Sequence, residues 1–391
     1  MNPKIKELEK EINSIIVERQ ETVRGLMTAL LSRQHLFVVG PPGTAKSEMI
    51  RLLASSIKGS KGIEIKKFDI LMTRFTTPEE VVGPIKFSAL KQDKFERQVV
   101  GYLPDCHFAF IDEIWKSSSS ILNALLTILN ERMFKMNGEM KKVNLETCMS
   151  ASNEIPSDRE ELSALWDRFL LRYKVGYIQE DANFVAMLKQ RLGLNSIPRL
   201  KTRITLDELH AMQEEVKKVE ISDSLIDLVT SIRKSLLKEG IIASDRRYHH
   251  LFYIVKAHAY LEGRMKAIED DIEIMKYGLW DTPEQMPKVG KIIITSINPM
   301  QEKADEIYDA ILSALKSIDD EKDENAKRTL FAEVTGKTNK FLRQLEEIEK
   351  SLKADGKDTT RVREYINQTI ANLQEKGKEL FNFEIKVSGG A

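Results

Sequence analysis

Hydrophobic residues follow two different spacings along the first 180 or so positions. Short apolar runs with the length and flanking residues of buried strands lie at 36–39, 63–70, 108–111, 145–152 and 169–175. Between them, apolar residues recur at helical spacing over 46–57, 118–132 and 158–168, and an amphipathic helical region precedes them at 3–32. Strands that alternate with helices over residues 36–176 predict a parallel α/β sheet with helices on both faces.

The pattern is helical from about residue 180 to 282, and capping residues stand at the expected helix starts Thr205, Ser222 and Ser244. Three more helical stretches lie between 300 and 378. The run 292–294 and the alternation at 381–387 predict a small strand pair that pins the ends of this helical arm. A chain of this length is expected to form several domains: an α/β domain at 1–178, an all-helical domain at 179–286 and a mostly helical extension at 287–391.

Composition narrows the class of protein. The 391 residues are 42% hydrophobic and 31% charged, with a formal net charge of 0. A neutral chain has no general attraction for nucleic acid or an anionic membrane, so neither is an expected partner. No apolar run approaches the roughly 18 residues of a membrane span, and the charged N-terminus is not a secretory signal. Cys106 and Cys148 lie in apolar runs, as buried reduced thiols do, which favours a cytoplasmic protein.

A phosphate-binding loop is expected at Gly40-Pro-Pro-Gly-Thr-Ala-Lys-Ser47, between a predicted strand and a predicted helix. Its backbone N–H groups and the helix N-terminus would hold the phosphates, which makes cofactor-binding residues of Gly40, Pro41, Pro42, Gly43, Thr44 and Ala45. Lys46 would contact the β- and γ-phosphates, and Ser47 would ligate magnesium. Ala45 departs from the pattern, where glycine is usual. Alanine costs about 1 kcal/mol there if φ is positive, and nothing if the residue is helical.

Two carboxylates end the apolar strand Phe108-Ala-Phe-Ile-Asp-Glu113. An acid at the end of such a strand can hold hydrated magnesium beside a phosphate loop, so Asp112 is the expected metal residue. Glu113 is then the expected general base, which accepts a proton from the attacking water. Asn153 follows the next apolar strand and could orient that water or contact the γ-phosphate, although an ordinary turn cap explains it equally well.

Two arginines complete the set of candidate residues. Arg168 precedes a strand and could cross a subunit boundary to stabilise transition-state charge, with a surface ion pair to Asp167 as the alternative. Arg172 is a weaker candidate for this role. In the helical domain, Arg246 rather than Arg247 could fold back onto the phosphates, although without further context a solvated arginine is the better explanation.

Together these residues resemble those of an AAA+ ATPase. The loop with Ala45 before Lys46 is similar to that of the MoxR group, and further stretches resemble its RavA branch at 71–80, 101–104, 112–116 and 279–280. The resemblance covers roughly residues 1–285. It implies a homo-hexameric ring with ATP and Mg²⁺ at subunit interfaces, and a helical lid with Arg246 as a sensor. It also implies a helix-2 insert at 80–104 and a hairpin at 133–145.

Such a protein would hydrolyse ATP to drive chaperone-like remodelling or assembly of protein complexes, often with a von Willebrand factor A domain partner. The alternatives are a nucleic-acid motor, a chelatase-type motor subunit, and a nucleotide-binding module that never turns over. Many AAA+ chains carry Val-Gly-Gln where this chain has Val17-Glu-Arg-Gln20, which leaves the preference for ATP over GTP open. Phe134 and Met136 of the hairpin are either client contacts or packing residues.

Overall fold

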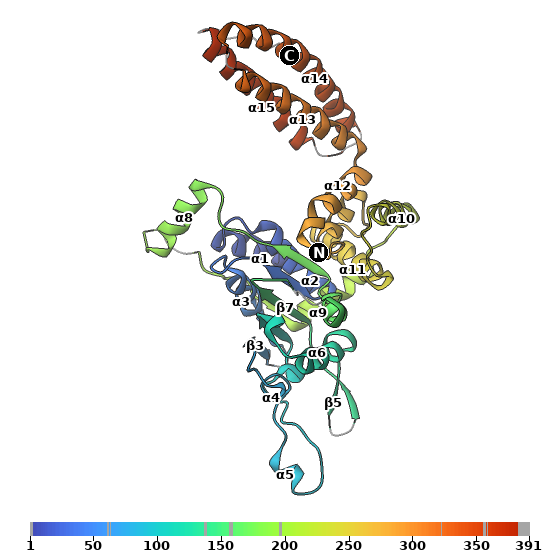
Figure 1. Cartoon of the computed structure of the whole chain (residues 1–391). Coiled ribbons are helices and arrows are strands. Elements are labelled where there is room, and N and C mark those ends of the chain that lie inside the picture. The colour runs from blue at the N-terminus through green and yellow to red at the C-terminus, as the bar shows by residue number, and fades with distance from the viewer. Residues whose placement is uncertain are drawn as a thin grey trace. The chain divides into compact units, whose positions relative to one another are not determined.

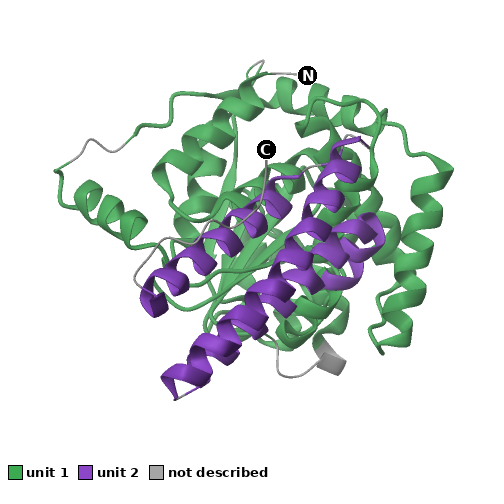
Figure 2. Ribbon diagram, turned by 90° about the horizontal axis from the view of Figure 1, so that it is seen from above, with its two compact units in different colours: residues 1–290 green, residues 291–391 purple. Residues whose placement is uncertain are grey.

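The computed structural model describes residues 3–60, 62, 64–136, 139–155, 159–194, 198–321, 323–354, 357 and 359–381. The chain forms two compact units, 1–290 and 291–391, which are coloured separately in Figure 2. The first unit contains the sheet and the helical lid, and the second is a bundle of helices. A division of the first unit near residue 178 stays a prediction.

The core of the first unit is a five-stranded parallel sheet in the order β3-β4-β7-β1-β8 (Figure 1). Its strands are β1 (Leu36–Val39), β3 (Lys67–Leu71), β4 (Phe108–Asp112), β7 (Thr147–Ser152) and β8 (Leu171–Lys174). Strands β1 and β7 are buried along their whole length, as parallel strands are when both faces of a sheet are covered. The predicted parallel α/β sheet is confirmed.

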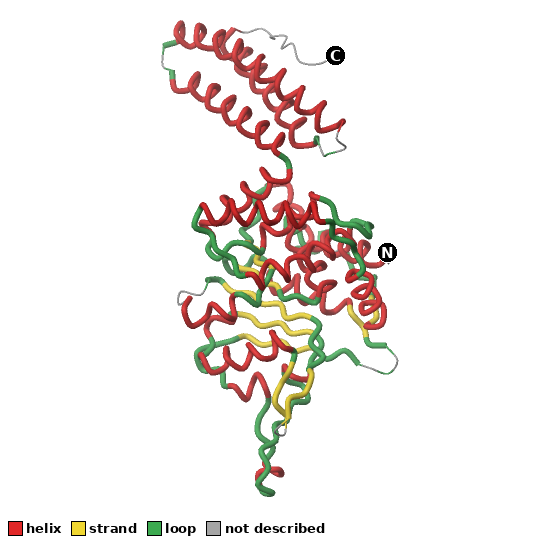
Figure 3. The backbone as a smooth tube through the Cα atoms, turned by 90° about the vertical axis from the view of Figure 1, so that its right-hand side faces the viewer, coloured by secondary structure: helices red, strands yellow, loops and turns green. Residues whose placement is uncertain are grey.

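Helices lie on both faces of this sheet (Figure 3). On one face, α2 packs so closely that a Cβ at Gly25 would lie 2.3 Å from the ring of Tyr173. On the other face, the ring of Trp166 in α7 lies 5.3 Å from that of Phe37. The α/β part contains the helices α1 (Pro3–Ile15), α2 (Gln20–Ser32), α3 (Lys46–Ser56), α6 (Ser119–Glu131) and α7 (Arg159–Trp166), and the short helices η1 (Leu103–Asp105) and η2 (Ile114–Lys116).

Two insertions project from the same side of the α/β part (Figures 1 and 3). The first carries α4 (Pro78–Val82) and α5 (Phe87–Leu90), and its two arms are joined by a single antiparallel bridge between Ile85 and Arg97. The second is the antiparallel hairpin of β5 (Met133–Met136) and β6 (Glu139–Lys142). The hairpin predicted at 133–145 is therefore present, while its expected turn, Asn137-Gly138, lies outside the described residues.

The helical part of the first unit contains α8 (Asp181–Arg191), α9 (Leu206–Lys217), α10 (Asp223–Lys238), α11 (Asp245–Leu261), η3 (Glu269–Tyr277) and η4 (Pro283–Gln285). The predicted capping residues Thr205, Ser222 and Ser244 are the N-caps of α9, α10 and α11. One feature was not predicted: β2 (Ile57–Lys58) and β9 (Ile204–Thr205) form a short parallel pair. Two-residue strands carry too little periodic pattern to be recognised in a sequence.

The second unit is built from α13 (Pro299–Asp320), α14 (Glu324–Ala354) and α15 (Thr360–Phe381). Their apolar faces form one core that includes Ile311, Leu345 and Leu373, so the three predicted helical stretches are confirmed. The predicted strand at 292–294 is wrong, because these residues lie inside α12 (Met286–Ile297). The second predicted strand, 381–387, starts at the last residue of α15 and otherwise lies outside the described residues. Within the described ranges, no helix is long and apolar enough to cross a membrane.

Candidate functional site

The predicted phosphate loop and acidic pair lie at one edge of the sheet. Strand β1 ends at Val39 and leads into the loop, β4 ends at Asp112, and β7 ends just before Asn153. All strands of this sheet are parallel, so their carboxyl ends share an edge, which is where open α/β sheets bind ligands.

The backbone of the loop explains its glycines and its alanine. A Cβ at Gly40 would lie 2.2 Å from the carbonyl oxygen of Val175, so only glycine fits against β8 there. Gly43 has a positive φ of 80°. Ala45 is also left-handed, with φ 62° and ψ 20°, so the loop carries a small strain at this position rather than an ordinary helical residue.

The Lys46 ammonium lies inside the loop. Its Nζ donates hydrogen bonds to the carbonyl oxygens of Gly40 (2.7 Å) and Pro41 (2.8 Å) and to Oδ1 of Asn153 (3.0 Å). Burial lowers the pKa of Lys46, against the opposite effect of the nearby Asp112 and Glu113 carboxylates. The structure therefore brings together the three predicted groups Lys46, Asn153 and the loop backbone.

Ser47 and Asp112 form the second contact of the site. The Ser47 hydroxyl donates a 3.0 Å hydrogen bond to Oδ2 of Asp112. Hydroxyl and carboxylate oxygens are ligands that Mg²⁺ prefers, and Mg²⁺ in nucleotide sites keeps several waters and takes few protein ligands. The donor set fits a magnesium ion that is shared with phosphates.

Glu113 directly follows β4 in a left-handed conformation (φ 53°, ψ 40°), and it is only 7% exposed. Its Oε2 accepts a 3.0 Å hydrogen bond from the Ser152 hydroxyl and lies 3.4 Å from Nζ of Lys116. Neither partner was predicted from the sequence. The only signal for Ser152 was its place beside Asn153, at the end of an apolar strand.

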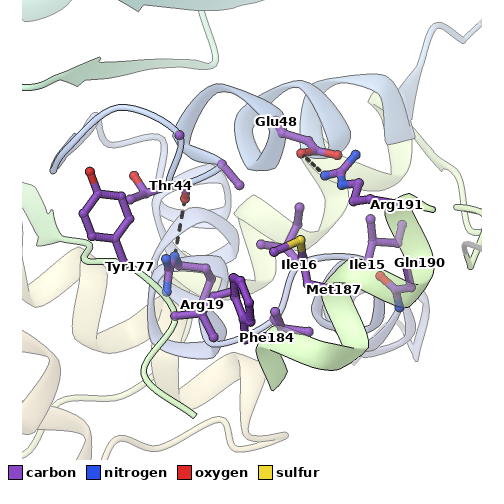
Figure 4. A pocket seen from close by; sticks show the side chains of 14 residues that line it. Ile15, Ile16, Arg19, Thr44, Glu48, Tyr177, Phe184, Met187, Gln190 and Arg191 are labelled. Atoms are coloured by element: carbon purple, nitrogen blue, oxygen red, sulfur yellow. Dashed lines mark hydrogen bonds and ion pairs between the residues drawn. The ribbon is translucent and has the colours of Figure 1, made fainter. Parts of the chain in front are cut away.

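A pocket of about 550 Å³ opens beside the phosphate loop (Figure 4). Apolar and aromatic side chains line much of it, including Ile16, Tyr177, Phe184 and Met187. The buried Arg19 links two segments of the pocket wall. Its guanidinium donates hydrogen bonds to the carbonyl oxygen of Gly176 and, at 3.5 Å, to that of Thr44. This pocket was not predicted. Two of its lining residues, Val17 and Arg19, belong to the segment Val17-Glu-Arg-Gln20, which stands where many AAA+ chains carry Val-Gly-Gln.

Helix α8 forms one side of the pocket and is held at both ends. At its start, the Glu18 carboxylate accepts hydrogen bonds from the backbone N–H groups of Gln179 (2.8 Å) and Glu180 (2.9 Å), and these bonds lower the pKa of Glu18. At its end, Arg191 forms a 2.6 Å ion pair with Glu48 of α3. The pocket wall is thus linked to the helix that follows the phosphate loop.

Arg168 and Arg246 lie elsewhere. Arg168 precedes β8, whose first residue Leu171 pairs with Leu36, the first residue of β1. Arg168 is therefore at the amino edge of the sheet, opposite the phosphate loop. Burial lowers its pKa and so does the charge of Arg246, which places the two arginines near each other. The structure brings these two residues together, but it does not bring them to the loop of their own chain.

The two weaker candidates, Arg172 and Arg247, are both buried in one ion-pair network. Arg247 Nη2 lies 2.7 Å from Asp167 and 2.9 Å from Asp281, and Arg172 Nη1 lies 2.8 Å from Asp281. Arg246, by contrast, is exposed. The network links the segment that carries Arg168 to the start of α11, and its members are occupied by structural contacts.

The parallel sheet, the phosphate loop at its carboxyl edge and the following helices define an AAA+ module. The family described as the MoxR domain in the MoxR-vWA-beta-propeller ternary systems matches residues 3–214, and the AAA lid domain matches residues 224–293. The chain belongs to the MoxR family of AAA+ ATPases.

Individual relatives agree with this family. The uncharacterised protein MJ0079 of Methanocaldococcus jannaschii is 38% identical over 320 residues, which cover 81% of each chain. The chaperone MoxR1 of Mycobacterium tuberculosis is 23% identical over 228 residues, 57% of this chain and 56% of that one. The crystal structure of a candidate ATPase from Cytophaga hutchinsonii has the same fold, with a TM-score of 0.59 at 20% identity over 75% of this chain and 93% of that one.

Proposed function

We propose that the protein binds ATP with Mg²⁺, hydrolyses it, and uses the energy to remodel or assemble protein complexes. The observation that carries this proposal is the meeting of Lys46, the Ser47–Asp112 pair and Glu113 at the carboxyl edge of one sheet. These are the parts that phosphoryl transfer to water requires: a cation for the phosphates, ligands for magnesium and a base for the water.

The residues of the site have different roles in this proposal. Backbone N–H groups of residues 40–45 and the Lys46 ammonium hold the phosphates, and Lys46 exchanges its carbonyl contacts for phosphate oxygens. Ser47 and Asp112 hold Mg²⁺, which neutralises phosphate charge when bound. Glu113 accepts the proton of the attacking water. Asn153, whose Oδ1 contacts Lys46, orients that water or contacts the γ-phosphate.

The pocket beside the loop is the proposed site of the base and ribose. It adjoins Thr44 and Ala45, and its volume of about 550 Å³ is in the range of small-molecule sites. The rings of Tyr177 and Phe184 offer flat apolar surfaces for a base. We expect ATP to be preferred over GTP, as in the family, and competition between the two nucleotides for a fluorescent ATP analogue tests this expectation.

Arg168 and Arg246 are proposed to act on the nucleotide of a neighbouring subunit. The Nε atom of Arg168 has no hydrogen-bond partner in the part of the chain that the structure describes. Its Nη1 lies 3.9 Å from the Asp167 carboxylate, and the charge of Arg246 acts on the same guanidinium group. Two adjacent guanidinium groups attract an anion such as a terminal phosphate. A head-to-tail arrangement that joins the amino edge of one sheet to the carboxyl edge of the next forms a ring when its rotation closes, and we propose a closed homo-hexamer.

The two insertions offer a surface for a protein client. The first exposes the large aromatic side chains Phe87 and Phe95, and Phe75 (91% exposed) lies in the segment that leads into it. The hairpin with Phe134 and Met136 extends in the same direction. Exposed aromatic groups of this kind are typical of protein contacts.

The proposed partner and compartment rest on the matching family and on the two cysteines. The family that matches the chain is described with MoxR-vWA-beta-propeller systems, so we propose a von Willebrand factor A domain protein as partner. The likeness to the RavA branch rests on the sequence stretches alone. Cys106 and Cys148 are free and buried, which fits a reducing compartment such as the cytoplasm.

Two variants test the ATPase. Lys46→Ala is expected to abolish nucleotide binding, because no other cation replaces its ammonium in the loop. Glu113→Gln is expected to bind ATP as the parent does but to release no phosphate, since the amide cannot accept the proton. Fluorescent nucleotide binding and phosphate release measure the two effects. Hydrolysis at the parent rate by the Glu113 variant would show that another group is the base.

A mixing experiment tests the shared site. Arg168→Ala should bind ATP and fail to hydrolyse it, like Glu113→Gln. A mixture of the two inactive variants contains interfaces with an intact Glu113 on one side and an intact Arg168 on the other, so turnover should return. If the mixture stays inactive while both variants still assemble, Arg168 does not act across subunits.

A further inference from the structure

Strand β7 ends in two polar side chains that contact different parts of the site. Ser152, its last residue, donates a hydrogen bond to the Glu113 carboxylate, and Asn153 accepts one from Lys46. Successive residues of an extended chain point in different directions, so the end of β7 can reach the base and the phosphate side at once. The hydrogen bond between Lys46 and Asn153 lies beside the proposed phosphate site. The hydrogen bond from Ser152 to Glu113 has no role in the function proposed so far.

Glu113 needs an external restraint to be a well-placed base. Its backbone is left-handed and its side chain is buried, so the carboxylate must be held by neighbours. Lys116 is one neighbour, but its side chain is exposed and its ammonium lies 3.4 Å away, and ion pairs at the surface restrain little. Ser152 is fully buried, and its hydroxyl lies 3.0 Å from the carboxylate.

The Ser152 hydroxyl is itself oriented. Its oxygen accepts the backbone N–H of Glu154 at 3.3 Å, which leaves its own proton for Oε2 of Glu113. Lys116 engages the same oxygen, Oε2. Both contacts therefore leave the other oxygen, Oε1, to accept a proton from water.

We infer that Ser152 is the positioning residue of this site, which holds Glu113 by one oxygen so that the other faces the attacking water. This inference rests on the proposed role of Glu113 as the general base. Ser152 contacts neither nucleotide nor water in this scheme and acts only through the carboxylate. Its loss should therefore reduce the rate of hydrolysis without reducing the affinity for the nucleotide.

The same strand supplies a matched control. Ser150 is also fully buried, two residues earlier on the same side of β7, and its hydroxyl donates a 2.7 Å hydrogen bond to the backbone carbonyl of Ile111. Ser152→Ala and Ser150→Ala each remove one buried, hydrogen-bonded hydroxyl from one strand. Only the first removes a contact to Glu113.

The experiment measures kcat, KM for ATP and nucleotide affinity for both variants of the full chain. Hydrogen bonds to charged groups contribute enough that Ser152→Ala should lower kcat about ten- to a hundredfold, with KM and affinity within about twofold of the parent. Ser150→Ala should leave kcat within about twofold of the parent. Equal kcat values for the two alanine variants, with an active parent, would overturn the role of Ser152.

A second pair of variants covers the case in which alanine disturbs the fold. Ser152→Thr keeps the hydroxyl, and Ser152→Val has nearly the shape of threonine but no hydroxyl. The threonine variant should therefore retain most of the parent kcat, and the valine variant should not. Equal rates of the two would also overturn the proposal. In a Glu113→Gln background, Ser152→Ala should have no further effect on the residual single-turnover rate, because it acts through that carboxylate. If neither the parent nor Ser150→Ala releases phosphate, the ATPase proposal fails instead.

Discussion

Ala45 is the residue at which the phosphate loop passes into α3, and its left-handed backbone (φ 62°, ψ 20°) makes a measurable prediction. A residue with a Cβ pays roughly 1–2 kcal/mol for this conformation. Glycine adopts it freely but loses more freedom on folding, a cost of roughly 0.5–1 kcal/mol. Ala45→Gly is therefore expected to raise the free energy of unfolding by about 0.5–1 kcal/mol.

The matched control is an alanine in ordinary helical conformation. Ala211 is exposed within α9, where the backbone is helical and carries no left-handed strain for glycine to relieve. Ala211→Gly should therefore lower the free energy of unfolding by about 0.5–1 kcal/mol. The same substitution at two positions of the first unit is thus expected to have opposite signs. At about 2–4 °C per kcal/mol, the two variants should differ in Tm by several degrees.

Thermal and urea unfolding of the nucleotide-free protein measure both variants. If Ala45→Gly lowers the Tm as far as Ala211→Gly does, the backbone at residue 45 is not left-handed and the strain inferred for the loop does not exist. An unchanged m-value in urea would show that the free energy of unfolding has changed without a change in the compactness of either state.

Two further predictions concern packing and buried charge. Gly40→Ala should abolish nucleotide binding in a titration, because its Cβ would lie 2.2 Å from the Val175 carbonyl oxygen and must displace the loop. Asp271 is buried, and although burial favours its neutral form, bonds from Arg264, His258 and a backbone N–H hold its pKa below the usual value. The stabilisation it provides is present above about pH 4 and disappears as the pH falls through the lowered pKa. Asp271→Asn should therefore be less stable at pH 7, with a smaller loss of stability on acidification in urea titrations.

The parts of the site that could be predicted are those that a short stretch of sequence encodes. The phosphate loop and the pair Asp112-Glu113 each follow one apolar strand, so the parallel direction of the predicted strands places both at one edge. The pocket beside the phosphate loop could not be predicted, because residues near 16, 44 and 184 meet there only after the chain has folded. The roles of Ser152 and Arg19 depend on such distant contacts as well.

The strand wrongly predicted at 292–294 has a related explanation. Three consecutive isoleucines have high strand propensity, and the sequence pattern within that window is the same for a strand and a buried helix. Over a wider window, Val289, Ile293 and Ile297 recur every four residues, and all three are buried on one side of α12. Helical spacing across more than two turns outweighed local propensity, as tertiary packing commonly does.

The positions of Arg168 and Gly40 at opposite edges of one sheet constrain how hydrolysis can depend on assembly. Strand β1 alone, with four residues at about 3.3 Å each, separates the two edges by about 13 Å. An arginine at the amino edge therefore cannot serve the phosphates of its own chain. If Arg168 is needed for turnover, the activity per chain must fall when the protein is diluted below its assembly concentration, while ATP binding, which uses one chain only, persists. Constant activity per chain for a species whose mass is that of a monomer would exclude the shared site and leave Arg168 a structural residue.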